Sequence, residues 1–489
     1  MNKGILSRLY RHNLTLLTDL YQLTMANGYW ENDLYDNEAV FHMFFRKTPF
    51  NGNYAIACGL ELLVDFIKNF RFEVDDIQYL AGLKAADGTA LFDESFLNYL
   101  QRLEFTCDVD ALPEGTLCSE HQPLLRIKGP LLQAQLLETV ILNIINFSTL
   151  IATKAARIIQ VANGDSVLEF GLRRAQGIDG GLTASRAAYI GGCHATSNVL
   201  AGKLFKIPVR GTHAHSWVMS FDYELEAFAS YAESMSHNSV FLVDTYDTIE
   251  GVKHAIQIGY DLRDHGQEML GIRLDSGDLA ELSIAARKLL DEAGFPNAKI
   301  VASNDLDEHS IKTLKEKGAQ ITVWGIGTKL STAYDQPALG GVYKLAAIKD
   351  QFDNWQDRIK LSEQSIKTSN PGIQQIVRLF QNKIPVADVI YDTKDFSANK
   401  NFISFVKFGK THPSRIKFDE SQELLVPIFR KGKLVYKLPD IKQIRARTIS
   451  QLKTFEKVDL NKYPKGLESR LWKLKSELIE NHNKQTVKI

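Results

Sequence analysis

The chain is short of several features that would assign a protein to a particular class. Its 489 residues include only four cysteines, which are Cys58, Cys107, Cys118 and Cys193. None belongs to a C-x-x-C pair, so a disulfide scaffold is excluded and the reducing cytoplasm is the predicted compartment. Lysine and arginine total 58, as do aspartate and glutamate. This balance leaves no net charge to attract nucleic acid or an anionic membrane, so neither is expected as a partner.

Two further sequence signals are missing. The motif G-x-x-x-x-G-K-[ST] does not occur, so any use of ATP does not depend on a P-loop. The N-terminal residues MNKGILSRLYRHN contain no apolar core of signal-peptide length. The most apolar stretch, residues 131–162, includes Glu138, Lys154 and Arg157, and a membrane span tolerates few such residues. We therefore expect this stretch to be a buried helix of a soluble protein.

Helical and extended patterns along the chain predict three parts. Residues 1–150 mix both patterns and are expected to form an α+β sandwich domain. Residues 151–348 alternate short apolar runs with helical segments, which is typical of parallel βαβ units. Residues 349–489 are expected to return strands to the N-terminal domain and to end in a helical extension. The predicted fold class is α/β, with an irregular α/β barrel as the central part.

The central part contains six short apolar runs that end in glycine or polar residues. Continuous apolar runs indicate buried parallel strands, and the active sites of α/β barrels gather at the carboxyl ends of such strands. We therefore expect one catalytic face. Because six strands fall short of eight, the predicted barrel is irregular. The runs are SVLEFG, PVRGTHAH, VFLVDTYD, MLGIRLDSG, KIVASND and ITVWGIG.

Three local elements are predicted outside the central part. Thr18 and Asp19 offer acceptors for the start of a helix over LYQLTMANGYW. The turn residues Asn370-Pro371-Gly372 predict a β-hairpin. The apolar spacing of KGLESRLWKLKSELIENHNK predicts one amphipathic helix near the C-terminus.

The segment GIRLDSGDL carries charged residues at the end of a predicted strand. An arginine within an apolar strand, Arg273, costs desolvation free energy unless it meets an anion. Asp275 and Asp278 suit a partly hydrated Mg²⁺ that bridges to substrate phosphates. The alternative is an internal ion pair between arginine and aspartate.

Two other strand ends favour anion binding. In ITVWGIGT, Gly327 and Thr328 could form a nest of backbone N–H groups for a phosphate, or the glycines could serve only the geometry of a turn. In EFGLRRAQG, Phe170 precedes the adjacent Arg173 and Arg174, which suit a polyanion. The alternative for the two arginines is a solvated pair on a loop.

The segment THAHSW has three interpretations. His213 and His215 lie on one face if the strand is regular, and H-x-H at a barrel strand end could bind Zn²⁺ or Fe²⁺. That metal site needs further ligands, and among nearby histidines only His194 is found. The second interpretation is a single reactive imidazole that acts as base or nucleophile. The third is a hydrogen-bonded histidine of the core.

With these motifs in place, the sequence resembles the nicotinate phosphoribosyltransferase family, the type II phosphoribosyltransferases. The matching segments follow the family's order, span roughly residues 18–345 and include several long ones, while the chain beyond about residue 350 matches more weakly. They are TDLYQLTMANGY, FFRKTPFNGNYAIACGLE, LLETVILNIINFSTLIATKAARI, EFGLRRAQGIDGGLTASRAAYIGG, RGTHAHSWVMSF, LVDTYDT, GIRLDSGDL, VASNDLDE, GIGTKL and QPALGGVYKL.

The resemblance implies a reaction and its co-substrates. The family joins nicotinate to phosphoribosyl pyrophosphate, giving nicotinate mononucleotide and pyrophosphate for NAD biosynthesis. ATP hydrolysis is coupled through a phosphorylated histidine, which the GT-x-AHS match places at His215. Mg²⁺ and Arg273 are expected to stabilise the departing pyrophosphate. Asp275 and Asp278 would face the ribose and Mg²⁺, and Asp275 is a predicted catalytic residue with His215 and Arg273.

The resemblance also implies substrate contacts and a homodimer with shared sites. Tyr21 of a partner subunit would sandwich the pyridine ring against Phe170. Gly327 and Thr328 would hold the 5′-phosphate, and Arg273 would lie near the substrate carboxylate and the ribose phosphates. Further predicted substrate-binding residues are Arg173, Thr212, Ser197, Ser303 and Asn304. One departure is His213, where the family pattern leads us to expect an apolar residue.

Three alternative functions remain at this stage. The related nicotinamide phosphoribosyltransferases carry an aspartate that accepts a hydrogen bond from the amide, where this sequence has Ser197. A metal-dependent amidohydrolase barrel would explain the H-x-H pattern. A catalytically inactive barrel that serves as a binding protein would need lost site residues, and none is missing.

Overall fold

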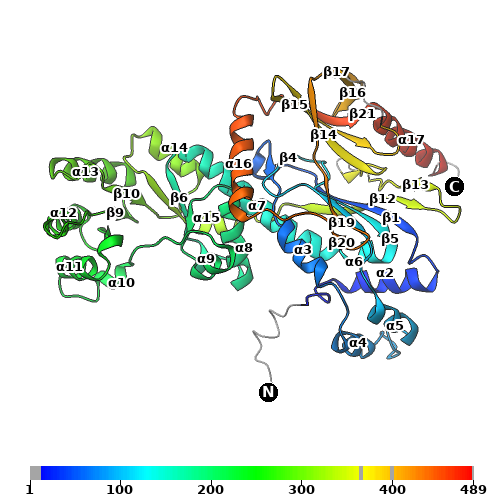
Figure 1. Cartoon of the computed structure of the whole chain (residues 1–489), viewed down its shortest axis with the longest axis horizontal. Coiled ribbons are helices and arrows are strands. Elements are labelled where there is room, and N and C mark those ends of the chain that lie inside the picture. Colours follow the sequence, from blue (N-terminus) through cyan, green and yellow to red (C-terminus); the bar gives the residue numbers. More distant parts are fainter. Residues whose placement is uncertain (1–12, 363–366, 397–400, 487–489) are drawn as a thin grey trace. The chain divides into compact units, whose positions relative to one another are not determined.

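The computed structural model describes residues 13–362, 367–396 and 401–486, and the chain divides into two compact units (Figure 1). Unit 1 comprises Met1–Thr149, Leu339–Asp440 and Ser450–Ile489. Unit 2 comprises Leu150–Ala338 and Ile441–Ile449. Both units contain helices and sheets, so the chain has a mixed α/β fold.

A seven-stranded sheet forms one layer of unit 1, and its middle strands come from distant parts of the chain. Strand β1 (Glu38–Phe45) is almost wholly buried and pairs antiparallel with β5 (Leu125–Pro130) and β12 (Gly341–Lys349). The aromatic and branched residues of β1 explain its place in the core. The full order is β13 (Trp355–Asp357), β12, β1, β5, β3 (Asp108–Ala111), β19 (Val426–Arg430) and β20 (Lys433–Leu434).

A second, six-stranded sheet of unit 1 is formed by the C-terminal part of the chain. A buried ion pair ties two of its neighbouring strands, because Arg378 of β14 meets Asp388 of β15 at 2.7 Å. Helix α17 (Ser469–Thr486) packs on this sheet. The order is β17 (Ser414–Lys417), β16 (Phe402–Lys407), β21 (Lys465–Glu468), β15 (Ile384–Asp392), β14 (Gln374–Gln381) and β18 (Glu420–Glu423).

The remaining elements of unit 1 are short helices and one small ladder. Helix α2 begins beside Thr18 and Asp19 as predicted, but Asp19 makes no side-chain cap; its carboxylate accepts a hydrogen bond from Thr139 instead. The elements are α2 (Leu20–Glu31), η1 (Pro49–Asn51), β2 (Ala55–Ile56), α3 (Leu60–Lys68), α4 (Val74–Ala81), α5 (Glu94–Arg102), β4 (Leu117–Cys118) and α6 (Leu131–Leu136).

The apolar stretch 131–162 forms two helices, α6 and α7 (Glu138–Ala162), rather than one. Residues of α7 belong to both units, as do those of α16 (Ile441–Phe455). By length and composition α7 is the one described helix that could cross a membrane, but 67% of its most apolar window is buried inside the protein. Burial of this kind is typical of a core helix.

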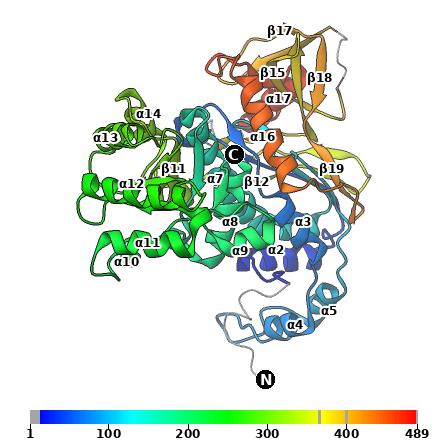
Figure 2. The same ribbon diagram turned by 60° about the vertical axis from the view of Figure 1, so that its left-hand side comes forward.

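Unit 2 is built on a six-stranded sheet in which every pairing is parallel. The order is β7 (Ala195–Thr196), β6 (Ser166–Glu169), β11 (Val323–Ile326), β10 (Lys299–Ala302), β9 (Gly271–Leu274) and β8 (Val240–Leu242). Helices α12 (Thr248–Asp264), α13 (Leu279–Glu292) and α14 (Glu308–Glu316) connect β8, β9, β10 and β11 in turn. These helices lie side by side along the sheet (Figure 2), which completes three successive βαβ units.

Most of the other helices of unit 2 precede β8, and one follows β11. They are η2 (Leu172–Arg174), α8 (Gly177–Ile190), α9 (Val199–Phe205), α10 (His215–Val218), α11 (Glu224–Ser234) and η3 (Ser236–Asn238), and α15 (Thr328–Ser331) follows β11. Among the described residues, the ladder of this sheet is open between β7 and β8. The predicted strand PVRGTHAH is wrong as a regular strand, because only Val209 forms a bridge, to Thr196. The proline at its start and Gly211 within it are poor strand formers.

Two predictions for the C-terminal part are corrected. Residues Asn370-Pro371-Gly372 do not turn a hairpin, because residues 360–362 and 367–369 of the expected first strand form no strand; residues 363–366 of that expected strand lie outside the described part. The hairpin joins β14 and β15 instead, and turns at Asn382 and Lys383 with φ of 53° and 64°. Positive φ at both central residues is typical of a type I′ turn, but Asn-Lys lacks the usual glycine signal.

The predicted amphipathic helix near the C-terminus starts later than expected. Its first four residues form β21, which pairs with β15 and β16. Gly466 is needed there because a Cβ at this position would lie 2.1 Å from the Val406 carbonyl oxygen. Close pairing of the backbones, which the helical periodicity does not reveal, explains the difference.

Candidate functional site

The predicted site residues of unit 2 gather beyond the carboxyl ends of its parallel strands. Phe170 follows β6, Ser197 follows β7, Asp275 follows β9 and Ser303 follows β10. A cavity of about 340 Å³ opens here. It is lined by Phe170, Leu172, Arg173, Ser197, Gly211, Thr212, His213, Ala214, His215, Leu242, Arg273 and Asp275.

Arg273 joins several of these side chains. Its guanidinium donates to Ser303 Oγ at 2.9 Å, to Thr212 Oγ1 at 3.2 Å and to Asp275 Oδ1 at 3.2 Å. Ser303 also donates to the same oxygen of Asp275. The guanidinium carbon lies 5.7 Å from the centre of the Phe170 ring. The internal Arg–Asp ion pair considered from the sequence is therefore present, and it faces the same cavity as the aromatic ring.

His215 stands at the start of α10 with both ring nitrogens near oxygen atoms. Its Nδ1 lies 3.1 Å from Thr245 Oγ1, which follows β8. Its Nε2 lies 3.8 Å from Asp275 Oδ2. The His215 side chain is 39% exposed, so its ring is accessible from the cavity.

His213 lies in a different environment from His215. Only 8% of its surface is exposed, and its Nε2 accepts a hydrogen bond from the Leu242 backbone N–H at 3.2 Å. Burial lowers the pKa of His213 to about 4. The two imidazoles therefore do not converge on one point, and the arrangement does not resemble an H-x-H metal site. Among the described residues no group of three or more histidine, cysteine or carboxylate side chains could hold a metal ion.

The two predicted magnesium ligands have different surroundings. Asp278 caps α13, where its carboxylate accepts from two backbone N–H groups and lies 3.7 Å from Lys317 Nζ. These backbone hydrogen bonds hold the pKa of Asp278 below its usual value. Asp275 instead borders the cavity, and its N–H donates to Asp244 Oδ2 at 2.7 Å. The other oxygen of Asp244 is buried and has no hydrogen-bond partner among the described residues.

Asp244 was not singled out in the sequence, although the run VFLVDTYD also ends in a carboxylate. A second buried carboxylate, Glu169, was missed as well because it reads as part of a strand. It is 1% exposed and accepts hydrogen bonds from Gly171 N–H at 2.5 Å, Ser185 Oγ at 2.8 Å and Thr196 Oγ1 at 2.6 Å. Glu169 thus fixes the backbone next to Phe170.

The predicted phosphate-binding residues, Gly327 and Thr328, and the predicted substrate-binding residue Asn304 follow two neighbouring strands, β11 and β10. Gly327 precedes the short helix α15, which starts at Thr328. Asn304 and Asp305, after β10, have positive φ of 106° and 45°. Such conformations cost of order 1–3 kcal/mol each and cluster at functional sites. Their contact with substrate stays a prediction.

Arg173 and Arg174 lie in η2 at the mouth of the cavity. Both side chains are exposed, and neither makes a hydrogen bond or ion pair to any residue that the structure describes. Tyr21 belongs to unit 1, where it lies on α2 and is 50% exposed. Its predicted part in a composite site stays a prediction.

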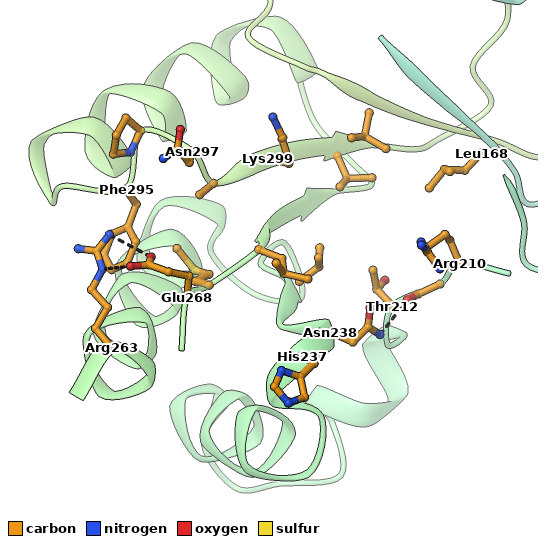
Figure 3. A pocket seen from close by; sticks show the side chains of 18 of the residues that line it. Leu168, Arg210, Thr212, His237, Asn238, Arg263, Glu268, Phe295, Asn297 and Lys299 are labelled. Atoms are coloured by element: carbon orange, nitrogen blue, oxygen red, sulfur yellow. Dashed lines mark hydrogen bonds and ion pairs between the residues drawn. The ribbon is translucent and has the colours of Figure 1, made fainter. Parts of the chain in front are cut away.

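A larger cavity of about 1000 Å³ extends among the strands of unit 2 (Figure 3). It reaches Phe170 and Thr212, so it borders the same residues as the smaller one. Figure 3 shows Asn238 bonded to the Arg210–Thr212 segment at one end and the Arg263–Glu268 ion pair at the other. The predicted barrel is not confirmed, because the described strands of this sheet do not close, but open space beside the predicted pyridine contacts is compatible with ligand binding.

Comparisons with known proteins cover nearly the whole chain. Residues 16–146 match the nicotinate phosphoribosyltransferase (NAPRTase) N-terminal domain, residues 166–384 the NAPRTase family and residues 373–475 the C-terminal domain. The nicotinate phosphoribosyltransferase of Bacillus subtilis is 43% identical over 479 residues, which cover 96% of this chain and 95% of that protein.

Solved structures agree with the sequence relatives. The crystal structure of human nicotinic acid phosphoribosyltransferase superposes with a TM-score of 0.82 at 32% identity, and covers 94% of this chain and 99% of that one. A nicotinate-nucleotide pyrophosphorylase from Pyrococcus furiosus, at 20% identity and a TM-score of 0.69, shares the fold. The chain belongs to the nicotinate phosphoribosyltransferase family.

Proposed function

We propose that this protein transfers the phosphoribosyl group of phosphoribosyl pyrophosphate to nicotinate, and that ATP drives the reaction by phosphorylating His215. Membership of the family supports the transfer reaction. The observation that carries the rest is the geometry of His215, whose exposed ring faces Asp275 beside Arg273 in one cavity.

The surroundings of His215 suit a phosphate acceptor. If Nδ1 donates its proton to Thr245 Oγ1, the lone pair remains on Nε2. Attack of Nε2 on the γ-phosphorus of ATP forms the N–P bond, breaks the bond to ADP and leaves ADP as the departing group. Arg173, which lines the cavity, and the adjacent Arg174 would offset the charge of the bound phosphates. His213 is unsuited to this role because its Nε2 is occupied by the Leu242 N–H.

Nicotinate fits the side chains between Phe170 and Arg273. Its ring would stack on Phe170, and its carboxylate would accept from Arg273 and from the hydroxyls of Thr212 and Ser197. An amide substrate would need an acceptor for its N–H groups. The nearest carboxylate, Asp275, already accepts from Arg273 and Ser303. These features favour nicotinate over nicotinamide.

Mg²⁺ would be held at the carboxylates beside β8 and β9. Mg²⁺ commonly binds one or two carboxylates together with substrate phosphates. Asp275 and the unpartnered oxygen of Asp244 fit that requirement, whereas Asp278 is engaged as a helix cap. When bound, the ion would stabilise the departing pyrophosphate.

A homodimer would complete the site with Tyr21 of a second copy. Exposed apolar side chains support an interface on both units. On unit 2 they surround the site on η2, α8 and α9; on unit 1 they precede and begin α2. These residues are Leu172, Ile178, Val199, Leu200 and Leu204 of unit 2, and Leu14, Leu17, Leu20 and Tyr21 of unit 1. Several exposed apolar side chains on neighbouring elements are typical of interaction sites.

The phosphohistidine is tested with γ-labelled ATP. We expect an acid-labile, base-stable phosphate on the wild-type enzyme. The label should disappear in His215→Ala together with the stimulation by ATP, while His213→Gln should keep the label. Unlabelled wild-type enzyme, or a label that persists in His215→Ala, would overturn the proposed role.

A further inference from the structure

The segment that leads from β7 to α10 carries two imidazoles, those of His213 and His215. One is hydrogen-bonded to the last residue of β8, and the other lies beside a residue that follows this strand. The Leu242 N–H donates to His213 Nε2 at 3.2 Å, and Thr245 Oγ1 lies 3.1 Å from His215 Nδ1. The two partners, Leu242 and Thr245, are three positions apart along the chain, and the two histidines are two positions apart. A movement of either imidazole would be transmitted to the other through this short connection.

The Leu242 N–H is a donor that the sheet itself cannot pair. Val243 N–H donates to the Arg273 carbonyl of β9 at 3.2 Å. Because successive backbone groups of a strand point in opposite directions, the Leu242 N–H points away from β9, and β8 is the edge strand. Leu242 is only 1% exposed, so water does not reach it freely. The ring of His213 supplies the acceptor that a neighbouring strand would otherwise provide.

His213 is suited to be a permanent acceptor. A backbone N–H only donates, so Nε2 carries no proton, and the proton of the neutral ring lies on Nδ1, 3.4 Å from the Ala214 carbonyl oxygen. The ring packs edge-on against Tyr231 with centroids 4.7 Å apart. Burial, and then the nearby Arg273 and His215, lower the pKa of His213 to about 4, so it stays neutral at physiological pH.

The same segment is tied to the other edge of the sheet by ordinary backbone bonds. Thr196 of β7 accepts from Arg210 N–H at 3.0 Å and donates to the Pro208 carbonyl at 3.0 Å. Asn238, just before β8, donates to the Gly211 carbonyl at 3.1 Å (Figure 3). The open edge of the parallel sheet is thus bridged by residues 208–213, and the last link, to β8 itself, is the imidazole of His213.

We infer that His213 is a positioning residue, which anchors the Thr212–His215 segment to β8 and so holds the His215 ring between Thr245 and Asp275. This inference rests on the proposed role of His215 as the phosphate acceptor. It also gives a role to the histidine that departs from the family's apolar pattern. In this role His213 acts only through the position of His215.

Two substitutions separate the hydrogen bond from the volume of the ring. In His213→Gln, Oε1 lies about as far from the backbone as Nε2 and retains the acceptor. His213→Leu keeps apolar bulk and removes the acceptor, which leaves a buried N–H unpaired. The matched controls are His265→Gln and His265→Leu, because His265 directly follows α12, its side chain is exposed, and among the described residues that side chain bonds only to the Asp261 carbonyl, at 2.7 Å.

The full-length enzyme is assayed for the rate of label transfer from γ-labelled ATP and for the ratio of ATP-stimulated to ATP-free turnover. His213→Leu should lower both by about tenfold, as expected when a buried donor loses its partner. His213→Gln should restore both to within about threefold of wild type, and the His265 variants should change neither. The inference would be overturned if His213→Leu kept the wild-type label-transfer rate and ATP stimulation, or if His213→Gln lost as much of both as His213→Leu.

Amide hydrogen exchange distinguishes failure of this inference from failure of the proposed function. The peptide that contains Leu242 should exchange faster in His213→Leu than in wild type or His213→Gln. If wild-type enzyme takes no label on His215, the phosphohistidine proposal fails, and this exchange pattern still decides whether His213 anchors the segment. Unchanged exchange in His213→Leu would show that the anchor does not exist.

Discussion

Replacement of Gly325 by alanine tests whether Phe170 forms one wall of the nicotinate site. Gly325 lies in β11 beside the Phe170 ring, and its φ does not require glycine. A Cβ at this position would lie 2.8 Å from both Cδ2 and Cε2 of Phe170. Arg273 also lies near this ring, with its guanidinium carbon 5.7 Å from the ring centre. The ring therefore has to move away from Gly325, which displaces the surface on which the pyridine would stack.

The magnitude follows from this contact. An ordinary carbon–carbon contact is about 3.5–4.0 Å, so the ring must move by roughly half an ångström or more. Overpacking of this kind costs about 1–3 kcal/mol of folding free energy. An aromatic stack contributes about 0.5–1.5 kcal/mol beyond the area it buries, so its loss would raise the KM for nicotinate about two- to tenfold.

The assay is steady-state turnover, first with nicotinate varied at saturating phosphoribosyl pyrophosphate. It is then repeated with phosphoribosyl pyrophosphate varied at saturating nicotinate. The KM for nicotinate should rise in Gly325→Ala, while that for phosphoribosyl pyrophosphate should change much less. Gly180→Ala is the control, because a Cβ there meets no atom within 4 Å. An unchanged KM for nicotinate in a folded Gly325→Ala enzyme would refute the assignment of Phe170 to the pyridine site.

Three further predictions concern assembly, specificity and pH. Mixing Tyr21→Ala with His215→Ala, each expected to lack ATP-stimulated turnover, should restore that turnover if Tyr21 acts in a partner's site, and no recovery after verified subunit exchange would place the whole site in one chain. Nicotinate should be preferred over nicotinamide by at least about tenfold, because each charge-assisted hydrogen bond contributes roughly 1.5–3 kcal/mol; Ser197→Asp should weaken nicotinate use, and comparable turnover of both substrates by the wild type would contradict this. The folded-state pKa of His213, about 4, is below its ordinary value of 6.5, so the unfolded chain binds more protons between these values. Stability from this group is present above pH 6.5 and is lost as pH falls toward 4, by at most about 1.4 kcal/mol per pH unit. Denaturant unfolding should therefore show His213→Gln losing less stability than wild type between pH 7 and pH 5, and equal losses would contradict the buried neutral ring.

The sequence predicted the position of the site better than its internal contacts. The ends of apolar runs placed Phe170, Asp275 and Ser303 at one edge of a parallel sheet, because such runs form buried strands, whereas Ser197 was named only through the family resemblance. This periodic signal is strong and local. The same signal does not show where the sheet ends. The run that contains His213 was therefore predicted as a strand, although it forms a single bridge.

Contacts between distant residues were the part that the sequence could not supply. Asp275 and Asp278 looked equivalent in GIRLDSGDL, yet one borders the cavity and the other caps a helix. The difference arises because α13 begins at Leu279 and its unpaired N–H groups attract the nearer carboxylate. Glu169 and Asp244 were overlooked because a buried carboxylate within an apolar run has no local signal of the donors that surround it.

The most direct test of the account is pyrophosphate release from phosphoribosyl pyrophosphate with nicotinate, measured with and without ATP for wild type and His215→Ala. We predict nicotinate-dependent release that ATP strongly stimulates in the wild type, and slow release without any ATP stimulation in His215→Ala. ATP stimulation that survives intact in His215→Ala, or wild-type release that does not depend on nicotinate, would contradict the proposed ATP-coupled transfer through His215.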